Sequence, residues 1–318
     1  MIITVTLNAA IDNTLAVPNF RLGKRHRAVE KHAAAGGKGI NVARALKCLG
    51  QPVIATGFAG GPTGTRIIEY LTAESVLNDF VRIGNDSRTS TVVIDPTSGE
   101  QTEIHERGPS ITAAELDLFR EKLIYLARGA DMCVFAGSTP RGVPIEVYAD
   151  LVTELRKLGV ETVVDAYSDA MRLAVKAEPG LITPNVVEAE ELVGREFAED
   201  DDEGIALAIA EMRNLGARDV VVTTADGCWA SFGAQSTKLL RATIKPLDPV
   251  SSVGSGDAFL AGFVTAQYIG LDAEASLRYA VACGAESTLH FGAGVVDRDG
   301  VDRLVDSVAI ETAPLPVA

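Results

Sequence analysis

Short apolar segments alternate with amphipathic segments along most of the chain. The short segments have the composition of buried strands, and the longer ones repeat apolar residues every three or four positions, as one face of a helix does. This alternation predicts repeated β-α-β units, and therefore an α/β fold around a largely parallel sheet. The expected strands are residues 1–7, 53–57, 132–136, 161–165 and 219–223, and the expected helices are 40–49, 63–73, 113–128, 144–158, 187–193, 203–215, 257–269 and 273–289.

Two polar, extended segments interrupt the alternation, at residues 14–34 and 87–107. The second is typical of a hairpin, with strands at 89–95 and 100–106 joined by a turn at 96–99. We expect the two segments to pair into a small β-sheet that covers a cleft as a lid; surface hairpins without a role are the alternative. The rest of the chain, residues 1–13, 35–86 and 108–318, is assigned to the α/β core.

Composition narrows the classes of protein. The chain has 318 residues, 47% of them hydrophobic, and its 43 acidic residues against 29 basic ones give a net charge of −14. Such a charge argues against a nucleic-acid-binding surface, so an anionic substrate would need a local basic cluster. No segment is apolar for the roughly 18 residues of a membrane span. The tail from Thr312 to Ala318 contains two prolines and is expected to fray.

The four cysteines are Cys48, Cys133, Cys228 and Cys283, and no two of them form a C-x-x-C pair. Each stands in an apolar segment, where a buried free thiol is the usual finding. Reduced thiols and the absence of a signal-like N-terminus favour a cytoplasmic protein.

A glycine-rich turn at residues 251–256 precedes the helix expected at 257–269. Backbone N–H groups are free at a helix N-terminus, and the helix dipole favours an anion there. Gly254 and Gly256 permit close approach of a ligand. Asp257 follows them, where its carboxylate could accept a proton from a hydroxyl that attacks a bound phosphoryl group. A capped core helix without a ligand is the alternative.

A second glycine turn, residues 36–39, opens the helix at 40–49 and places Lys38 and Asn41 where they could reach an oxygen-rich ligand. Its spacing is neither that of a P-loop nor that of a dinucleotide fingerprint, which argues against a Rossmann-type dehydrogenase. Asp12 follows the first strand, at the edge where α/β sheets bind ligands, and could accept hydrogen bonds from sugar hydroxyls or cap a turn.

Asn185 and Glu188 stand three residues apart after Pro184. The pair is typical of a capping box, with Asn as N-cap and Glu at the third helical position. The same oxygen-bearing side chains could instead hold a hydrated Mg²⁺ beside nucleotide phosphates.

Four blocks together resemble the ribokinase-like, or pfkB-type, carbohydrate kinase family. They are GGKGINVARAL (36–46), GSTPRGVP (137–144), TPNVVEAEELVG (183–194) and SSVGSGDAFLAGF (251–263), and their order and spacing match over nearly the whole chain. TLNAAID (6–12) adds a resemblance to the hexose-phosphate branch, which contains 1-phosphofructokinase and tagatose-6-phosphate kinase. The resemblance implies a three-layer α/β core and a β-sheet lid that commonly forms a homodimer interface.

The resemblance also implies ATP and Mg²⁺ as cofactors and assigns roles near the nucleotide. Asp257 becomes the base, and the backbone of Gly254, Ser255 and Gly256 becomes the anion hole for the transferring phosphoryl group. Asn185 and Glu188 match the motif that organises Mg²⁺ and the nucleotide phosphates, with Glu188 on the metal side. Thr223 and Gly227 match the nucleotide-side loop.

On the sugar side, the resemblance implies binding residues from several segments. Basic side chains would hold the substrate's own phosphate, because a guanidinium group grips phosphate through two parallel hydrogen bonds. These basic positions are Arg88, at the start of the hairpin, and Arg27. The other sugar-side positions are Asp12, Gly37, Lys38, Asn41 and Ser138.

The chain departs from the family pattern at three places. Thr183 stands where the branch often has a lysine, so a cation expected near the nucleotide phosphates is missing. Ser251 stands where ribokinases have an aspartate near a monovalent-cation site, which puts potassium activation in doubt. The segment 222–227 matches the Thr-x-Gly-x-x-Gly loop imperfectly.

The leading hypothesis is therefore an ATP- and Mg²⁺-dependent kinase that converts fructose 1-phosphate to fructose 1,6-bisphosphate. The enzymatic alternatives are a tagatose-6-phosphate kinase and a kinase of an unphosphorylated sugar or nucleoside. A sugar-phosphate sensor without activity is an alternative of a different class, although a sensor would not need Asp257.

Overall fold

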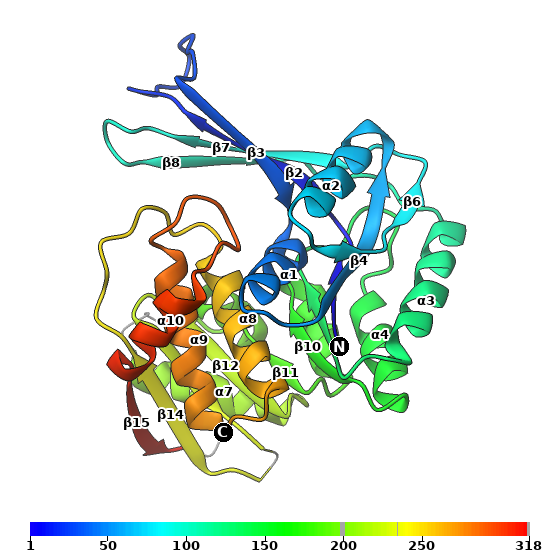
Figure 1. Ribbon diagram of the computed structural model, residues 1–318. Helices are drawn as coiled ribbons and strands as arrows, with labels where there is room; N and C mark the ends of the chain where they lie inside the picture. The colour runs from blue at the N-terminus through cyan, green and yellow to red at the C-terminus, as the bar shows by residue number, and fades with distance from the viewer. Residues whose placement is uncertain (198–200, 234, 317–318) are drawn as a thin grey trace.

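The computed structural model of the protein describes residues 1–197, 201–233 and 235–316. It contains a large, mostly parallel sheet between two layers of helices, and a separate small sheet that projects from one end of this core (Figure 1). The fold is thus the mixed α/β architecture that the alternating pattern predicts.

The large sheet grows outward from the first strand. β1 pairs in parallel with β4 on one side and with β9 on the other, and β10, β11 and β12 follow in parallel. Three antiparallel strands then complete that edge, in the order β12-β13-β14-β15. The strands are β1 (Ile2–Thr6), β4 (Val53–Gly60), β5 (Leu77–Asn78), β6 (Val81–Ile83), β9 (Met132–Ala136), β10 (Glu161–Asp165), β11 (Leu181–Ile182), β12 (Asp219–Thr224), β13 (Gly227–Ser231), β14 (Lys238–Thr243) and β15 (Ala309–Pro314).

Helices cover both faces of this sheet. One apolar cluster joins the sheet to α1, α2, α8, α9 and α10, and the other joins it to α3, α4, α5, α6 and α7. The helices are α1 (Lys38–Cys48), α2 (Gly61–Ala73), α3 (Ala113–Ala127), α4 (Val147–Lys157), α5 (Ser168–Val175), α6 (Val186–Val193), α7 (Asp202–Asn214), α8 (Ser255–Tyr268), α9 (Ala273–Ser287) and α10 (Arg298–Leu304).

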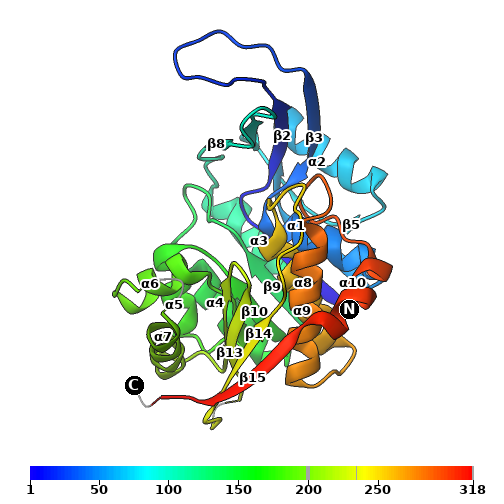
Figure 2. The same ribbon diagram turned by 90° about the vertical axis from the view of Figure 1, so that its left-hand side faces the viewer.

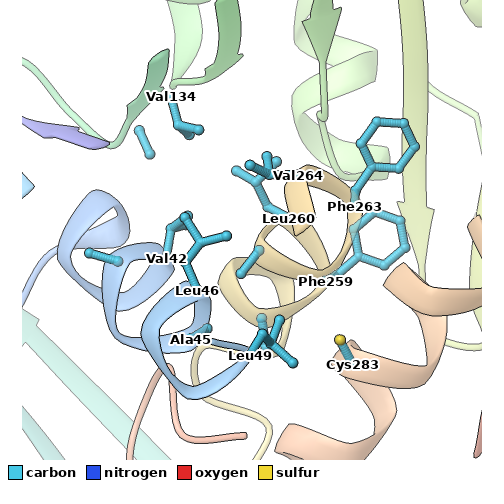
Figure 3. Packing of buried hydrophobic residues seen from close by; sticks show 14 of the residues in the cluster. Val42, Ala45, Leu46, Leu49, Val134, Phe259, Leu260, Phe263, Val264 and Cys283 are labelled. Carbon is cyan, nitrogen blue, oxygen red and sulfur yellow. The ribbon is translucent and has the colours of Figure 1, made fainter. Parts of the chain in front are cut away.

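The helices that carry both glycine turns pack against each other. Val42 and Leu46 of α1 and Leu260 of α8 are fully or almost fully buried in one cluster, beneath Val134 of β9 (Figure 3). Gly262 of α8 has no room for a side chain, because an added Cβ would lie 2.7 Å from Cβ of Cys283 in α9. This close packing fixes the beginnings of α1 and α8 relative to each other.

The small sheet has the strand order β3-β2-β7-β8, and both views show it standing away from the core (Figures 1 and 2). Its strands are β2 (Ala10–Ala16), β3 (Glu30–Gly36), β7 (Arg88–Ile94) and β8 (Gln101–His105). The hairpin thus lies where the sequence predicts it. β2 begins four residues before the predicted segment, and β3 runs on to Gly36, because Ala10 pairs with Gly36 as the last rung of a regular ladder.

The C-terminal tail corrects one expectation. Residues 309–314 form β15, which pairs with β14 from Lys238 to Thr243 instead of fraying. The strand tolerates its proline because Pro314 is its last residue, where a missing N–H removes little from the ladder. Residues 317 and 318 lie outside the described part of the chain.

All four cysteines are free thiols, and three of them are buried, as the apolar segments around them predict. Among the residues that the structure describes, each helix is too short or too polar to span a bilayer.

Candidate active site

A cavity of about 620 Å³ lies between the small sheet and the core, and most of the predicted site residues line it. Small-molecule sites of α/β proteins are commonly found in such a crevice, at the ends of the parallel strands. The predicted residues that line it are Asp12, Gly37, Lys38, Asn41, Arg88, Asn185, Glu188, Thr223, Gly227, Gly254, Ser255, Gly256 and Asp257.

The glycine turn at the start of α8 has a backbone conformation and a packing that require glycine at position 254. Gly254 is the N-cap with φ 81°, in the left-handed region, and an added Cβ would lie 2.6 Å from that of Ala293. The Ser255 N–H already donates to the Ser252 carbonyl at 3.2 Å. A Cβ at Gly256 would meet open space, so its backbone faces the cavity without a covering side chain.

Asp257 lies in the first turn of α8 and is 6% exposed. Burial and the charge of Asp165 raise the pKa of its carboxyl group to about 7, while Lys38 and Asn41 act in the opposite direction. The Asn41 amide donates to Asp257 Oδ2 at 2.8 Å. A carboxylate with this pKa can accept a proton from a hydroxyl near neutral pH.

Arg44 holds the Asn41 amide in this orientation. Its Nη1 donates to Asn41 Oδ1 at 3.2 Å and to the Ala293 carbonyl at 2.9 Å. Its Nη2 donates to the Ala35 carbonyl at 2.7 Å, and Glu74 pairs with its Nε at 2.6 Å. One buried guanidinium group therefore links the end of β3, the loop that packs on Gly254, and the partner of Asp257.

Lys38, the first residue of α1, lies between two carboxylates. Its Nζ is 2.9 Å from Asp165 Oδ1, 3.3 Å from Glu188 Oε1, and 4.2 Å from the centre of the Tyr167 ring. Burial lowers the pKa of the ammonium group, but the surrounding negative charge outweighs it and the net pKa is raised. Burial raises the pKa of Glu188, and Lys38 offsets part of that rise.

Asn185 and Glu188 form the predicted capping box at the start of α6. The Asn185 side chain accepts from the Glu188 N–H at 2.9 Å, and Glu188 Oε2 accepts from the Asn185 N–H at 3.0 Å. Glu188 lines the cavity and uses Oε1 to contact Lys38 there. Glu188 can therefore cap the helix through Oε2 and still face a ligand. Beside them, Thr183 Oγ1 is buried and has no hydrogen-bond partner within the described chain.

On the opposite wall, Asp12 and Arg88 come from neighbouring strands of the small sheet. Burial raises the pKa of the Asp12 carboxyl group, and Arg88 offsets part of the rise. Arg88 Nε donates to the Asn8 carbonyl at 3.1 Å and Nη1 to the Glu106 carbonyl at 3.2 Å. An added Cβ at Gly36 would lie 1.9 Å from Asp12 Oδ2, so glycine there leaves space for this carboxylate.

Two predicted residues do not line the cavity. Arg27 is exposed in the loop between β2 and β3. Ser138 accepts a hydrogen bond of 3.1 Å from the Asn8 side chain and so borders the sugar-side wall through Asn8.

Sequence reasoning missed Asp165, Tyr167 and Arg44. Asp165 is the last residue of β10 and is 5% exposed, and a carboxylate at the end of a parallel strand is a signal that the sequence carries. Arg44 stands inside the apolar pattern of α1, where nothing local reveals that its partners come from three other segments.

The cavity combines a buried carboxylate beside a glycine turn at a helix N-terminus with further carboxylates on one side and a guanidinium group on the other, an arrangement compatible with phosphoryl transfer. A family model described as the pfkB family carbohydrate kinase matches residues 4–298. The chain belongs to the pfkB family of carbohydrate kinases. It is therefore a sugar kinase, and kinases of this family use ATP.

Three solved structures match almost the whole chain. Phosphofructokinase-2 from Escherichia coli, in complex with potassium, is 28% identical with a TM-score of 0.88, and the match covers 96% of this chain and 98% of that one. A protein from Thermotoga maritima described as a possible 1-phosphofructokinase is 25% identical with a TM-score of 0.83, covering 98% and 99%. Ribokinase from Arabidopsis thaliana, complexed with ribose and ATP, is 22% identical with a TM-score of 0.77, covering 96% and 98%, and shares the fold.

The cavity fits the magnesium ion that is generally expected in this family. Proteins hold Mg²⁺ through one or two carboxylates while phosphates and water supply the other ligands. Asp165 and Glu188 are such a pair, and the described residues contain no group of three or more histidine, cysteine or acidic side chains that could form a complete metal cage. When bound, the ion would neutralise charge on the nucleotide phosphates.

Proposed function

We propose that the protein transfers the γ-phosphoryl group of ATP to a ketohexose phosphate, with fructose 1-phosphate as the acceptor and fructose 1,6-bisphosphate as the product. The observation that carries this proposal is the position of Asp257, a nearly buried carboxylate in the first turn of the helix that begins at Gly254. A base and an anion site less than one helical turn apart suit a hydroxyl attacking a phosphoryl group.

In the proposed reaction, Asp257 accepts the proton of the sugar 6-hydroxyl as that oxygen bonds to the γ-phosphorus, and ADP leaves. The backbone of the turn at residues 254–256 faces the charge that develops on the transferred group, and the Ser255 N–H would give up its hydrogen bond to the Ser252 carbonyl to take part. Asn185, Thr223 and Gly227 border the nucleotide, with Glu188 on the side of the magnesium ion.

Arg88 and Asp12 support a phosphorylated acceptor. Arg88 lines the cavity. Its Nε and Nη1 donate to the Asn8 and Glu106 carbonyls, and its remaining nitrogen is Nη2. Asp12, Gly37 and Asn41 would position the sugar, and Ser138 would support that wall through Asn8.

The first experiment measures ATP consumption with Mg²⁺ on a panel of acceptors, in wild type and Asp257→Asn. The panel contains fructose 1-phosphate, fructose 6-phosphate, tagatose 6-phosphate, fructose, ribose and adenosine. Fructose 6-phosphate is included because a solved structure of the E. coli phosphofructokinase-2 contains it. Turnover on fructose 1-phosphate that disappears in the variant supports the proposal.

Other outcomes select among the alternatives. Preference for tagatose 6-phosphate or for an unphosphorylated acceptor would replace the substrate and keep Asp257 as the base. Binding of a sugar phosphate without turnover on any acceptor would indicate a sensor.

We also propose that the small sheet acts as a lid and as a homodimer interface. Its surface and its loop expose Leu22, Val29 and Ile104, which are 88%, 70% and 58% accessible in the single chain. Light scattering of wild type and of Leu22→Asp/Ile104→Asp tests this: a dimer that becomes a monomer supports it, and an unchanged mass contradicts it.

A further inference from the structure

The most constrained charged group in the cavity is Lys38. Its ammonium contacts Asp165 and Glu188. The side chain of Lys38 is 22% exposed, that of Asp165 is 7% exposed and that of Glu188 is 9% exposed. The three residues come from α1, from the end of β10 and from α6, so three distant segments converge on one point.

Physical chemistry explains why a lysine stands there. Two nearly buried carboxylates cost free energy unless a positive charge lies beside them. Glu188 Oε2 is already used by the Asn185 N–H, which leaves Oε1 for the ammonium. The Tyr167 ring at 4.2 Å closes another side of the ammonium. Lys38 therefore compensates the acidic pair in the absence of a ligand.

The same arrangement leaves the nucleotide side without a usable cation. Among the described residues that line the cavity, the basic side chains are Lys38, Arg88 and His105, and the last two belong to the small sheet. Thr183, which lines the core side, is uncharged and buried. If Lys38 stayed between its carboxylates throughout, none of the lysines or arginines that the structure describes in the core would line the cavity beside the transferring phosphoryl group, although such groups are stabilised by positive charge.

We propose that Lys38 and a divalent cation compete for the carboxylates of Asp165 and Glu188, so that metal binding releases the Lys38 ammonium toward the anion in the cavity. Carboxylate oxygens are the ligands that Mg²⁺ prefers, and a +1 and a +2 charge repel each other when both contact the same oxygens. Lys38 is thus a displaceable counter-ion that maintains the acidic pair before the metal arrives. The identity of the anion rests on the proposed function; the competition for the carboxylates does not.

Binding of Mn²⁺ alone, without nucleotide or sugar, tests the competition. The free ion is measured by electron paramagnetic resonance in wild type, Lys38→Met, Lys38→Gln, Asp165→Asn and the control Lys47→Met. Lys47 is an exposed lysine in the last turn of the same helix. We expect Lys38→Met and Lys38→Gln to bind Mn²⁺ about tenfold or more tightly than wild type, Asp165→Asn to bind it much more weakly, and Lys47→Met to match wild type.

A second measurement follows Lys38 in the unmutated protein. Lysines are dimethylated with a ¹³C label, which keeps their charge, and the Lys38 resonance is assigned by its absence in Lys38→Gln. We expect it to move on addition of Mg²⁺, while that of Lys47 stays in place.

A permanent structural ion pair gives a different pattern. The Lys38 resonance would not respond to Mg²⁺, and Asp165→Asn would bind Mn²⁺ as wild type does. Either result overturns the inference, as would equal Mn²⁺ affinity in wild type and both Lys38 variants. Because no assay here contains a sugar, an error in the proposed acceptor leaves these results unchanged, and a failure here leaves the acceptor panel unaffected.

Discussion

The amide of Asn41 donates to Oδ2 of Asp257 at 2.8 Å, while its own oxygen accepts from Arg44. Arg44 therefore determines which end of the amide faces the carboxylate. Because a hydrogen bond to the charged form favours that form, the contact lowers the pKa of Asp257 relative to burial alone.

Removing this donor should weaken the base. In Asn41→Ala the pKa of Asp257 rises, so kcat/KM at pH 7 falls by roughly tenfold, the value of one hydrogen bond to a charged group, and the acid limb of the pH profile moves to higher pH. Asn214→Ala, at the exposed end of α7, is the control. Arg44→Met should shift the limb in the same direction, and an unshifted limb in both variants would contradict the role of the network.

The pH dependence of the wild type follows from the same carboxylate. The pKa of Asp257 is raised to about 7, and a carboxylate can act as the proposed base only when it is ionised. We expect kcat/KM to fall about tenfold per pH unit below pH 7. Asp257→Asn should lose a factor of the order of 10²–10⁴ and show no such limb. Steady-state kinetics from pH 5 to 9 measure both.

Asp257 should also lower the stability of the fold. Its pKa is higher in the folded protein, about 7, than the ordinary value of 3.8, so the folded state binds the proton more tightly. The wild type therefore has its full unfolding free energy below pH 3.8, where Asp257 is protonated in both states, and loses part of it as the pH rises to 7. Relative to wild type, Asp257→Asn should gain up to about 4 kcal/mol in unfolding free energy over this window, with no further gain above it. Urea unfolding at pH 5 and pH 8 checks the sign, and a gain that is equal at both would be unexpected.

Arg88→Ala should separate the two substrates. We expect the KM for the sugar phosphate to rise at least tenfold while the KM for ATP changes little, because Arg88 belongs to the wall formed by the small sheet. Arg82→Ala, an exposed arginine of β6, is the control. Equal effects on both KM values would remove Arg88 from the sugar-phosphate site.

Gly254→Ala should damage the anion turn in two separable ways. The left-handed φ of 81° costs a side chain about 1–2 kcal/mol, and the new Cβ would lie 2.6 Å from that of Ala293. Ala293→Gly should relieve only part of the clash, because the Cα of residue 293 would still lie 2.8 Å from the new Cβ, and it leaves the backbone strain. The double variant should therefore recover only part of the lost ATP affinity. Calorimetry with a non-hydrolysable ATP analogue measures the affinity of each variant, and complete recovery of that affinity would mean that backbone strain plays no part.

Much of the secondary structure can be predicted from the sequence, because local patterns of apolar and polar residues determine it. Helices α1 to α4 and α6 to α9, and strands β1, β4, β9, β10 and β12, follow from periodicity, and the capping box of Asn185 and Glu188 follows from spacing alone. The short helices α5 and α10 are not among the elements that the pattern predicts. β11 has two residues and β5 likewise, too few for a periodic signal, so their pairing depends on neighbours that are already in place. The sequence of β15 does not predict a strand because none of its residues is fully buried and its exposure does not alternate, so only pairing with β14 defines it.

The residues of the candidate site also divide into those that local sequence predicts and those that only the folded chain brings together. Residues at strand ends and helix starts, such as Asp12 and Asp257, can be predicted from the sequence, because the pattern that predicts the strand or helix also places them. The contacts between Lys38, Asp165 and Glu188 join residues more than 100 positions apart and exist only once the chain is folded.

The strand order of the large sheet has a consequence for biosynthesis. β1 is made before the other strands of this sheet and lies inside it. On one side of β1, the strands β9, β10, β11, β12, β13, β14 and β15 follow in the order of their synthesis. Each new strand can therefore pair with the edge left by the one before it, without waiting for a later part of the chain. β15 is the outer strand of that edge in the folded protein, so the row of unpaired backbone groups, the kind of surface on which nascent chains associate wrongly, moves outward with each added strand and ends on β15.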